Sequence, residues 1–214
     1  MRHDIHKEVI YLASKTANPT RSDYLKVRQV IVYLQTTIYD GPTFYTEEGP
    51  VLYGHGDSSY GCHINGRSQS GYYCTIGMTS APVCCYTGMQ NDCVSTSAMQ
   101  AEYVCLSDLA KKTEWLRFLL DDVGFTQREP TVISPDNETA IKLSIATQIP
   151  RRSRHIHIKH HFIRDMCEAK RAKVVHVRTE KLVADLLTKP LTATKFKPFK
   201  YSLLNMKYHK RYKK

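Results

Sequence analysis

Apolar residues recur along the chain with two different periods, and the change of period predicts where helices and strands lie. Helical spacing or a helix start signal marks six stretches: 1–16, 24–39, 97–122, a short one from about 138, 151–169 and a last one from about 181. Strand-like runs occupy five stretches: 50–57, 69–77, 81–87, 131–135 and 174–177. Asn65 and Gly66, between the first two strands, are a hairpin signal.

The order of these elements predicts the fold class. Three strands in series favour an antiparallel meander, whereas the later strands, separated by helices, favour parallel additions. We therefore expect an α/β fold with a mixed five-stranded sheet flanked by helices.

Length limits the number of domains, and charge indicates the class of partner. A chain of 214 residues can form one domain with additions, or two small ones, with a proper core. Its formal net charge of +11 favours a polyanionic partner, either nucleic acid or an acidic membrane surface. A basic protein without such a partner is the plainer interpretation.

The cysteine count and the apolar runs indicate the cellular compartment. The seven cysteines are an odd number, the N-terminus has no apolar signal region, and no run of about 18 apolar residues exists. We expect an intracellular protein, cytoplasmic or nuclear, with reduced thiols and no membrane partner.

Four acidic residues occupy strand ends or helix starts. They are Asp57, Glu102, Asp136 and Asp185. If the sheet brings these ends together, the carboxylates form a site for two Mg²⁺ ions, because hard cations prefer oxygen ligands. Such a pair of ions can activate water and stabilise the leaving oxygen of a phosphodiester.

Each acid taken alone has a plainer interpretation. Asp57 can be a turn residue, and Glu102 a solvated residue on a helix. Asp136 can be the N-cap of the helix from about 138, and Asp185 can cap the last helix.

The same segments resemble the ribonuclease H end of copia-type LTR-retrotransposon Pol polyproteins. The motifs of that family are spread in order over residues 2–191, which makes the resemblance specific. The chain has Arg2–Ile5 for "RPDI", Asn18–Thr20 for "NPT", Val30–Thr37 for "VLRYLKGT", Gly66–Tyr72 for "RKSTSGY", Ala101–Tyr103 with Trp115–Arg117 for "EAEY…WLR", Asp136–Ile141 for "DNQSAI", His155–Arg164 for "HIDIRYHFIR" and Ala184–Leu191 for "ADILTKPL".

The resemblance implies a domain plan and an activity. Residues 1–47 are then a helical segment from the reverse transcriptase connection, 48–190 a ribonuclease H-like domain, and 191–214 a basic tail. The implied activity is hydrolysis of the RNA strand of an RNA–DNA hybrid. Partners are that hybrid and the reverse transcriptase portion of the parent polyprotein.

The resemblance also implies roles for the four acids. Asp57 bridges two Mg²⁺ ions, for which Mn²⁺ can substitute. Glu102 and Asp136 complete the first site, and Asp185 holds the second ion. Crowded carboxylates cannot all stay ionised without metal, so at least one pKa is expected to rise.

Further residues are candidates for nucleic-acid contact. Ser97 and Asn137 can bind substrate or simply cap helices. Arg154 and Lys159 lie in a basic segment that can contact phosphates or form a solvated helix face. His157 and His161, four apart, also permit a zinc site.

The C-terminal stretch from Lys189 to Lys214 carries nine lysines and arginines and no acid. Five aromatic residues lie among these cations, a composition that suits binding to single strands. A disordered basic end is the other interpretation.

The chain departs from the family pattern in places that face the substrate. The family's "YSDADW" is represented by His55–Tyr60, and its "SSTEAEY" by Ser97–Tyr103. Because the four acids remain, the leading hypothesis is a hybrid-specific ribonuclease. A non-catalytic nucleic-acid-binding remnant of the same domain and an inert structural relic are the alternatives.

Overall fold

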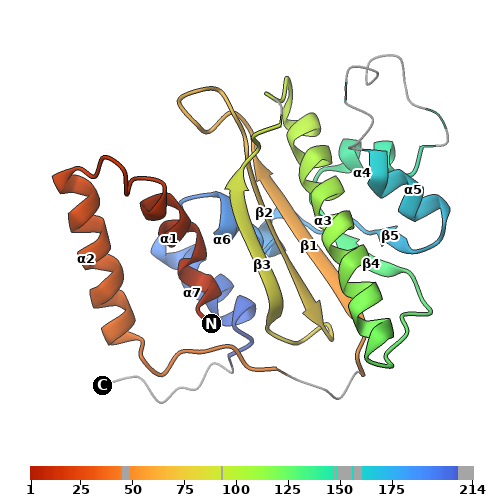
Figure 1. Cartoon of the computed structure of the whole chain (residues 1–214), viewed down its shortest axis with the longest axis horizontal. Coiled ribbons are helices and arrows are strands. Elements are labelled where there is room, and N and C mark those ends of the chain that lie inside the picture. Colours follow the sequence, from red (N-terminus) through yellow and green to blue (C-terminus); the bar gives the residue numbers. More distant parts are fainter. Residues whose placement is uncertain (45–48, 93, 147, 149–155, 157–160, 207–214) are drawn as a thin grey trace.

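One five-stranded sheet with helices on both faces forms the body of the protein (Figure 1). The computed structural model describes residues 1–44, 49–92, 94–146, 148, 156 and 161–206. The strand order in the sheet is β3-β2-β1-β4-β5. The first and fourth strands are therefore neighbours, which is the arrangement that the resemblance implies.

The pairing directions match the predicted mixed sheet. The strands are β1 (Leu52–Ser59), β2 (Gln69–Ile76), β3 (Pro82–Met89), β4 (Thr131–Ser134) and β5 (Ala172–Val174). The pairs β1–β2 and β2–β3 are antiparallel, whereas β4 runs parallel to both β1 and β5. The prediction is confirmed, although the fifth strand begins two residues earlier than expected.

Three helices cover one face of the sheet. They are α3 (Ala98–Asp122), α4 (Glu138–Ser144) and α5 (Phe162–Glu168), seen on the right of Figure 1. Their apolar residues join those of the strands in the main core, because alternate residues of each strand point to this face. Fully buried members of this core are Leu52, Cys74, Tyr103, Cys105, Leu106, Leu109, Ile133, Ile163 and Met166.

A second, smaller core lies on the opposite face. Here α6 (Asp185–Thr188) contacts the three antiparallel strands, and α7 (Ala193–Leu203) packs beside it. Tyr73, on the other side of β2 from the main core, packs with Leu187, Phe199 and Leu203. The disordered interpretation of the basic tail is therefore wrong for residues 193–203; residues 207–214 lie outside the described part of the chain.

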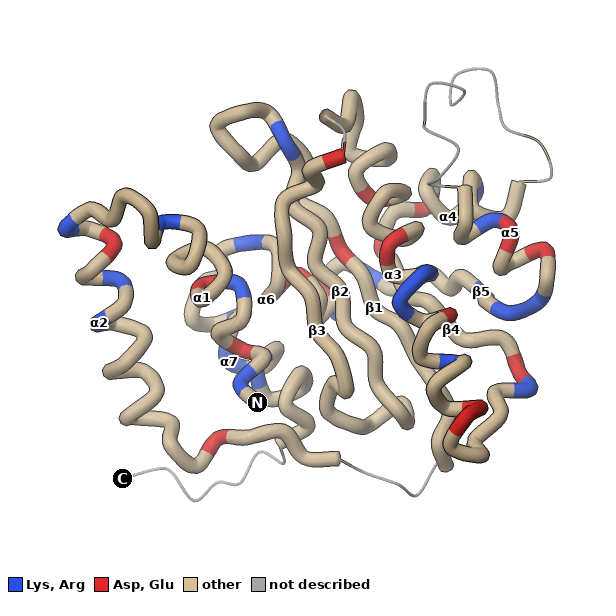
Figure 2. The backbone as a smooth tube through the Cα atoms, in the orientation of Figure 1, with Lys and Arg blue, Asp and Glu red and all other residues tan. Residues whose placement is uncertain are grey.

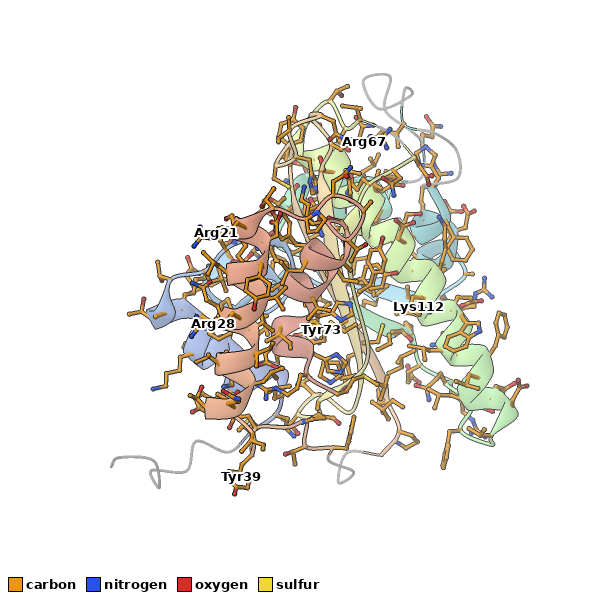
Figure 3. The ribbon with its side chains drawn as sticks, turned by 60° about the vertical axis from the view of Figure 1, so that its left-hand side comes forward. Arg21, Arg28, Tyr39, Arg67, Tyr73 and Lys112 are labelled. Atoms are coloured by element: carbon orange, nitrogen blue, oxygen red, sulfur yellow. The ribbon has the colours of Figure 1, made fainter. Side chains whose placement is uncertain are left out.

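The first N-terminal helix packs beside the third strand, and the second contacts the first. A short 3-10 helix, η1 (His3–Ile5), leads into α1 (His6–Ala13), which contacts β3. After it, α2 (Arg21–Thr36) begins three residues earlier than predicted, because Thr20 and Asp23 form a capping box. Figure 3 shows Arg21 and Arg28 projecting from α2 away from the sheet.

A polar network ties the two ends of this N-terminal segment together. Arg2 donates to Asp4 at 2.9 and 2.8 Å, and the Tyr33 hydroxyl donates to Asp4 Oδ2 at 2.6 Å. The third guanidinium nitrogen of Arg2, Nη1, donates to the backbone oxygen of Thr37 at 2.9 Å. The end of α2 is thereby fixed to the start of the chain.

Two helix predictions need correction. The predicted helix 151–169 is described only as α5, from Phe162 onward; residues 151–155 and 157–160 lie outside the described residues. The predicted last helix from about 181 is two short pieces, a 3-10 helix, η4 (Thr179–Lys181), and then α6, whereas α7 follows in the stretch predicted as a basic tail. Pro190 explains the break between α6 and α7, because Lys189 before it takes the extended backbone that a proline imposes.

No helix within the described ranges is both long enough and apolar enough to span a bilayer. The six cysteines in those ranges are free thiols, and Cys74 and Cys105 are fully buried core residues.

Candidate metal centre

Asp57 is placed by the close packing of α3 on β1. Gly54 and Gly56, two residues apart, precede it on the strand, and a Cβ on them would lie 3.2 and 3.1 Å, respectively, from a methyl carbon of Leu109. The absence of these side chains lets α3 approach the strand closely. Asp57 itself is fully buried.

Glu102 lies on the same side of α3 as Leu109, because seven residues are close to two helical turns. Its Oε1 accepts a hydrogen bond from the backbone N–H of Ser58 at 2.9 Å, the residue after Asp57. Its Oε2 is buried and has no hydrogen-bond partner among the described residues. Glu102 is only 5% exposed, so its interpretation as a solvated residue is wrong.

Asp136 reaches the site through the parallel pairing of β1 and β4. His55 pairs with Ser134 in this register, and Asp57 and Asp136 each follow two residues later. The Thr179 hydroxyl donates to Asp136 Oδ2 at 2.9 Å, and Nε2 of His176 lies 3.0 Å from the backbone oxygen of Asp136. The N-cap of α4 is Asn137, so the capping interpretation of Asp136 is wrong.

Oxygen atoms of Asp57, Glu102 and Asp136 all lie within 4.8 Å of one another. The set consists of carboxylates alone, which suits a hard divalent cation such as Mg²⁺. The unpaired, buried Glu102 Oε2 is a second sign that the group suits a cation, because such an atom is costly unless something binds it. The residues therefore fit a metal ion. Figure 2 shows acidic positions on β1 and along α3.

A glycine on the neighbouring strand brings α6 to the same place from the opposite face. Gly71 pairs with Asp57 across β1 and β2. A Cβ on Gly71 would lie 2.6 Å from Cγ2 of Thr188 and 2.7 Å from Cβ of Leu187. This approach lets the Thr188 hydroxyl donate a hydrogen bond to Asp57 Oδ2.

Asp185 is linked to Asp57 by a lysine. Lys189 Nζ donates to Asp57 Oδ1 at 3.0 Å and to Asp185 Oδ1 at 2.8 Å. Lys195 Nζ donates to the other oxygen, Asp185 Oδ2, at 2.7 Å. Asp185 is therefore a neighbour of the three-carboxylate group, but it is not a member of the group that can share one ion.

Four side chains that contact these carboxylates were not predicted from the sequence: Thr179, Thr188, Lys189 and Lys195. The segment Ala184–Leu191 was recognised as a motif, and it contains two of them. Lys189 follows Asp185 by four residues, a spacing that favours an ion pair on a helix.

Burial changes the acidity of two of the carboxyls. Loss of solvent, and then the nearby Asp57 charge, raise the pKa of Glu102 to about 8. Burial also raises the pKa of Asp57 to about 6, although the Lys189 ammonium opposes the shift. The expected rise of at least one carboxyl pKa is thus present.

The candidate nucleic-acid residues make capping contacts. Ser97 Oγ accepts from the backbone N–H of Gln100 at 3.2 Å, at the start of α3. Asn137 Oδ1 accepts from two backbone N–H groups at 3.0 Å each, at the start of α4. These contacts favour the capping interpretation for both residues. Arg154 and Lys159 lie outside the described residues.

The zinc alternative receives no support from His161. That side chain is buried, and its Nδ1 lies 2.9 Å from the hydroxyl of Tyr103. His157 lies outside the described residues. Within the described ranges, the metal-ligating group found is the carboxylate one.

Comparison with known proteins gives relatives over nearly the whole chain. No family model matches. Over 196 residues, 91% of the chain, it is 30% identical to the retrovirus-related Pol polyprotein from transposon TNT 1-94 of Nicotiana tabacum. Over 199 residues, 92% of the chain, it is 30% identical to that from transposon RE1 of Arabidopsis thaliana. The chain spans only 14% and 13% of these relatives.

Among solved structures, LC11-RNase H1, isolated from compost, aligns with 65% of this chain and 93% of its own, at 15% identity and a TM-score of 0.49. The class of protein follows from the curated relatives: the chain is related to the Pol polyproteins of transposons. The resemblance predicted from the motifs is confirmed, and the chain corresponds to a limited portion of such a polyprotein.

Proposed function

We propose that this chain is a Mg²⁺-dependent ribonuclease that hydrolyses the RNA strand of an RNA–DNA hybrid. The observation that carries the proposal is the convergence of Asp57, Glu102 and Asp136, with one buried Glu102 oxygen lacking a partner. The relationship to transposon Pol polyproteins supports it, because copying such an element involves RNA–DNA hybrids.

The proposed metal ligands divide into two sets. Asp57, Glu102 and Asp136 would hold one Mg²⁺, and Asp57 with Asp185 would hold a second; Mn²⁺ could replace either ion. Bound divalent ions supply charge stabilisation at the scissile phosphate and make water more acidic. In the hydrolysis, the water oxygen bonds to phosphorus and the P–O3′ bond breaks with its electron pair on O3′. The water loses one proton and O3′ gains one, which leaves a 3′-hydroxyl and a 5′-phosphate.

The neighbouring residues of the chain position these carboxylates. The Ser58 N–H orients Glu102, and the Thr179 hydroxyl orients Asp136. The Thr188 hydroxyl holds one oxygen of Asp57. Since these three contacts exist before substrate arrives, the three-carboxylate group is preorganised, and binding does not have to provide the energy of assembling it.

The partners in this proposal are an RNA–DNA hybrid and the reverse transcriptase portion of the parent polyprotein. The formal charge of +11 supports a polyanionic partner. Binding should therefore weaken as salt concentration rises, because each neutralised phosphate releases counterions.

The experiment is cleavage of an end-labelled RNA–DNA hybrid by purified protein with Mg²⁺. Asp57→Asn and Asp136→Asn are expected to abolish cleavage, because each removes an ionised ligand. Glu138→Gln is the matched control, since this acid is 70% exposed and lies two residues from Asp136. Tight binding of the hybrid without cleavage by the unmodified chain would favour the non-catalytic remnant.

A further inference from the structure

Lys189 occupies the space between two carboxylates that the proposed function assigns to a second metal ion. Its ammonium group lies 3.0 Å from Asp57 Oδ1 and 2.8 Å from Asp185 Oδ1. Mg²⁺ requires carboxylate oxygens at about 2.0–2.1 Å. An ion bridging these same oxygens would overlap the ammonium, so the lysine and a second ion exclude each other.

The other oxygen of Asp185 is also taken, because Lys195 Nζ lies 2.7 Å from Asp185 Oδ2. Asp57 Oδ2 accepts one hydrogen bond, from the Thr188 hydroxyl, and its second lone pair remains for the first ion. Asp57 and Asp185 are 0% and 1% exposed, so water cannot substitute for a lost partner without a rearrangement. Within the described residues, therefore, Asp185 has no unpaired oxygen for a second ion.

The charges of the site lead to the same conclusion. When ionised, Asp57, Glu102, Asp136 and Asp185 carry four negative charges, and Lys189 and Lys195 neutralise half of them. The remaining two negative charges match one Mg²⁺. A second Mg²⁺ with both lysines in place would make the site positive, which buried groups tolerate poorly.

We propose that Lys189 acts as a built-in cation that fills the second metal position, so that the chain without nucleic acid binds a single divalent ion. This inference rests on the proposed function and adds the order in which the two ions bind. The first ion binds at Asp57, Glu102 and Asp136. The second site forms only when the Lys189 side chain moves aside.

The lysine is placed so that it can move. Its side chain is 35% exposed, whereas the carboxylates it joins are buried. A flexible ammonium that reaches solvent can transfer from a carboxylate to a phosphate, since it bonds both as a point charge. The anionic backbone of a hybrid is therefore the partner expected to draw Lys189 out of the second position.

The test is calorimetric titration of Mg²⁺ into the full chain without nucleic acid, which counts ions independently of cleavage. The unmodified chain is expected to bind one ion. Asp57→Asn should lose it, whereas Asp185→Asn should retain it within about twofold, because Asp185 does not contact that ion. These two conservative variants test the proposal even if lysine variants fold poorly.

The lysine variants test the competition itself. Lys189→Met is expected to bind a second ion about tenfold or more tightly than the unmodified chain, since a neighbouring positive charge has been removed. Adding Asp185→Asn to that variant should remove the gained site. Lys197→Met is the matched control, because Lys197 is exposed on α7. Circular dichroism checks that each variant is folded.

Two ions bound by the unmodified chain, or no gain of a site in folded Lys189→Met, would overturn the inference. The cleavage assay separates this failure from that of the proposed function. A chain that binds two ions and cleaves the hybrid contradicts only the role of Lys189. A chain that binds one ion and never cleaves contradicts only the ribonuclease proposal. A chain that binds no Mg²⁺ at all contradicts both.

Discussion

Gly71 and Thr188, which are 117 residues apart in sequence, touch so closely that no side chain larger than hydrogen fits between them. A Cβ on Gly71 would lie 2.6 Å from Cγ2 of Thr188. The contact fixes α6 against β2, and the same threonine donates its hydroxyl to Asp57. One glycine thus sets the position of α6 relative to the carboxylates.

Gly71→Ala is expected to destabilise the fold by about 1–3 kcal/mol, because overpacking a buried contact forces backbone shifts. It should also lower cleavage, since the displaced α6 carries Thr188 and Asp185. Urea unfolding and the hybrid assay measure the two effects. Gly41→Ala is the control, because a Cβ there meets nothing within 4 Å. Equal stability of the two variants would contradict the packing account.

The acidity of Glu102 predicts how stability depends on pH in the absence of metal. Its pKa is about 8 in the folded protein and about 4.3 in an unfolded chain. The folded state therefore holds more protons between these values, so stability is greatest at low pH and declines as pH rises through this window. Urea unfolding with a chelator, from pH 5 to pH 8, measures the decline.

Glu102→Gln removes the titrating group and should flatten this decline, chiefly above pH 6. Asp57, with a pKa of about 6, continues to contribute below that pH. Glu138→Gln should leave the profile unchanged because Glu138 is exposed. An identical decline in Glu102→Gln and the unmodified chain would show that Glu102 is not the group responsible.

Metal binding should offset the loss of stability that ionising these carboxylates causes at high pH. Because a ligand that binds only the folded state stabilises it, Mg²⁺ is expected to raise the Tm of the unmodified chain as its concentration increases. The rise should be absent in Asp57→Asn. Differential scanning calorimetry at pH 8 is the measurement, and Ca²⁺ at equal ionic strength provides the comparison. A similar rise in Asp57→Asn would place the ion elsewhere.

The N-terminal network makes a prediction about α2. Tyr33→Phe removes the hydroxyl that donates to Asp4 at 2.6 Å and should cost about 1.5–3 kcal/mol, the range for a hydrogen bond to a charged group. Hydrogen exchange should show that amide protection is lost mainly in α1 and α2. Tyr24→Phe, on the exposed side of α2, is the control. Unchanged amide exchange in α2 would contradict the conclusion that this network stabilises the helix.

The sequence was sufficient for the sheet but not for the final helices. Strand lengths of about eight residues with clear turns allowed the first three strands to be predicted within two residues at each end. The last helix was misjudged because one helix was predicted from about 181, whereas the chain forms η4 there and begins α6 only at Asp185. Pro190 then ends α6 after one turn, because Lys189 before it takes an extended backbone.

The three carboxylates that gather around one point were predictable from motifs and strand ends. The lysine pairing was not, because it depends on how α6 lies over Gly71, a contact between distant segments. Periodicity reports which face of an element is buried, but it does not report the distance between faces. The bridging of Asp57 and Asp185 by Lys189 therefore required coordinates.

The most direct test of the account is a crystal structure of the full chain grown with Mn²⁺, located by its anomalous scattering. The account predicts an ion coordinated at once by Asp57, Glu102 and Asp136, with the free Glu102 Oε2 among its ligands. Crystals that bind Mn²⁺ elsewhere, or leave these three carboxylates without an ion at saturating concentration, would contradict it.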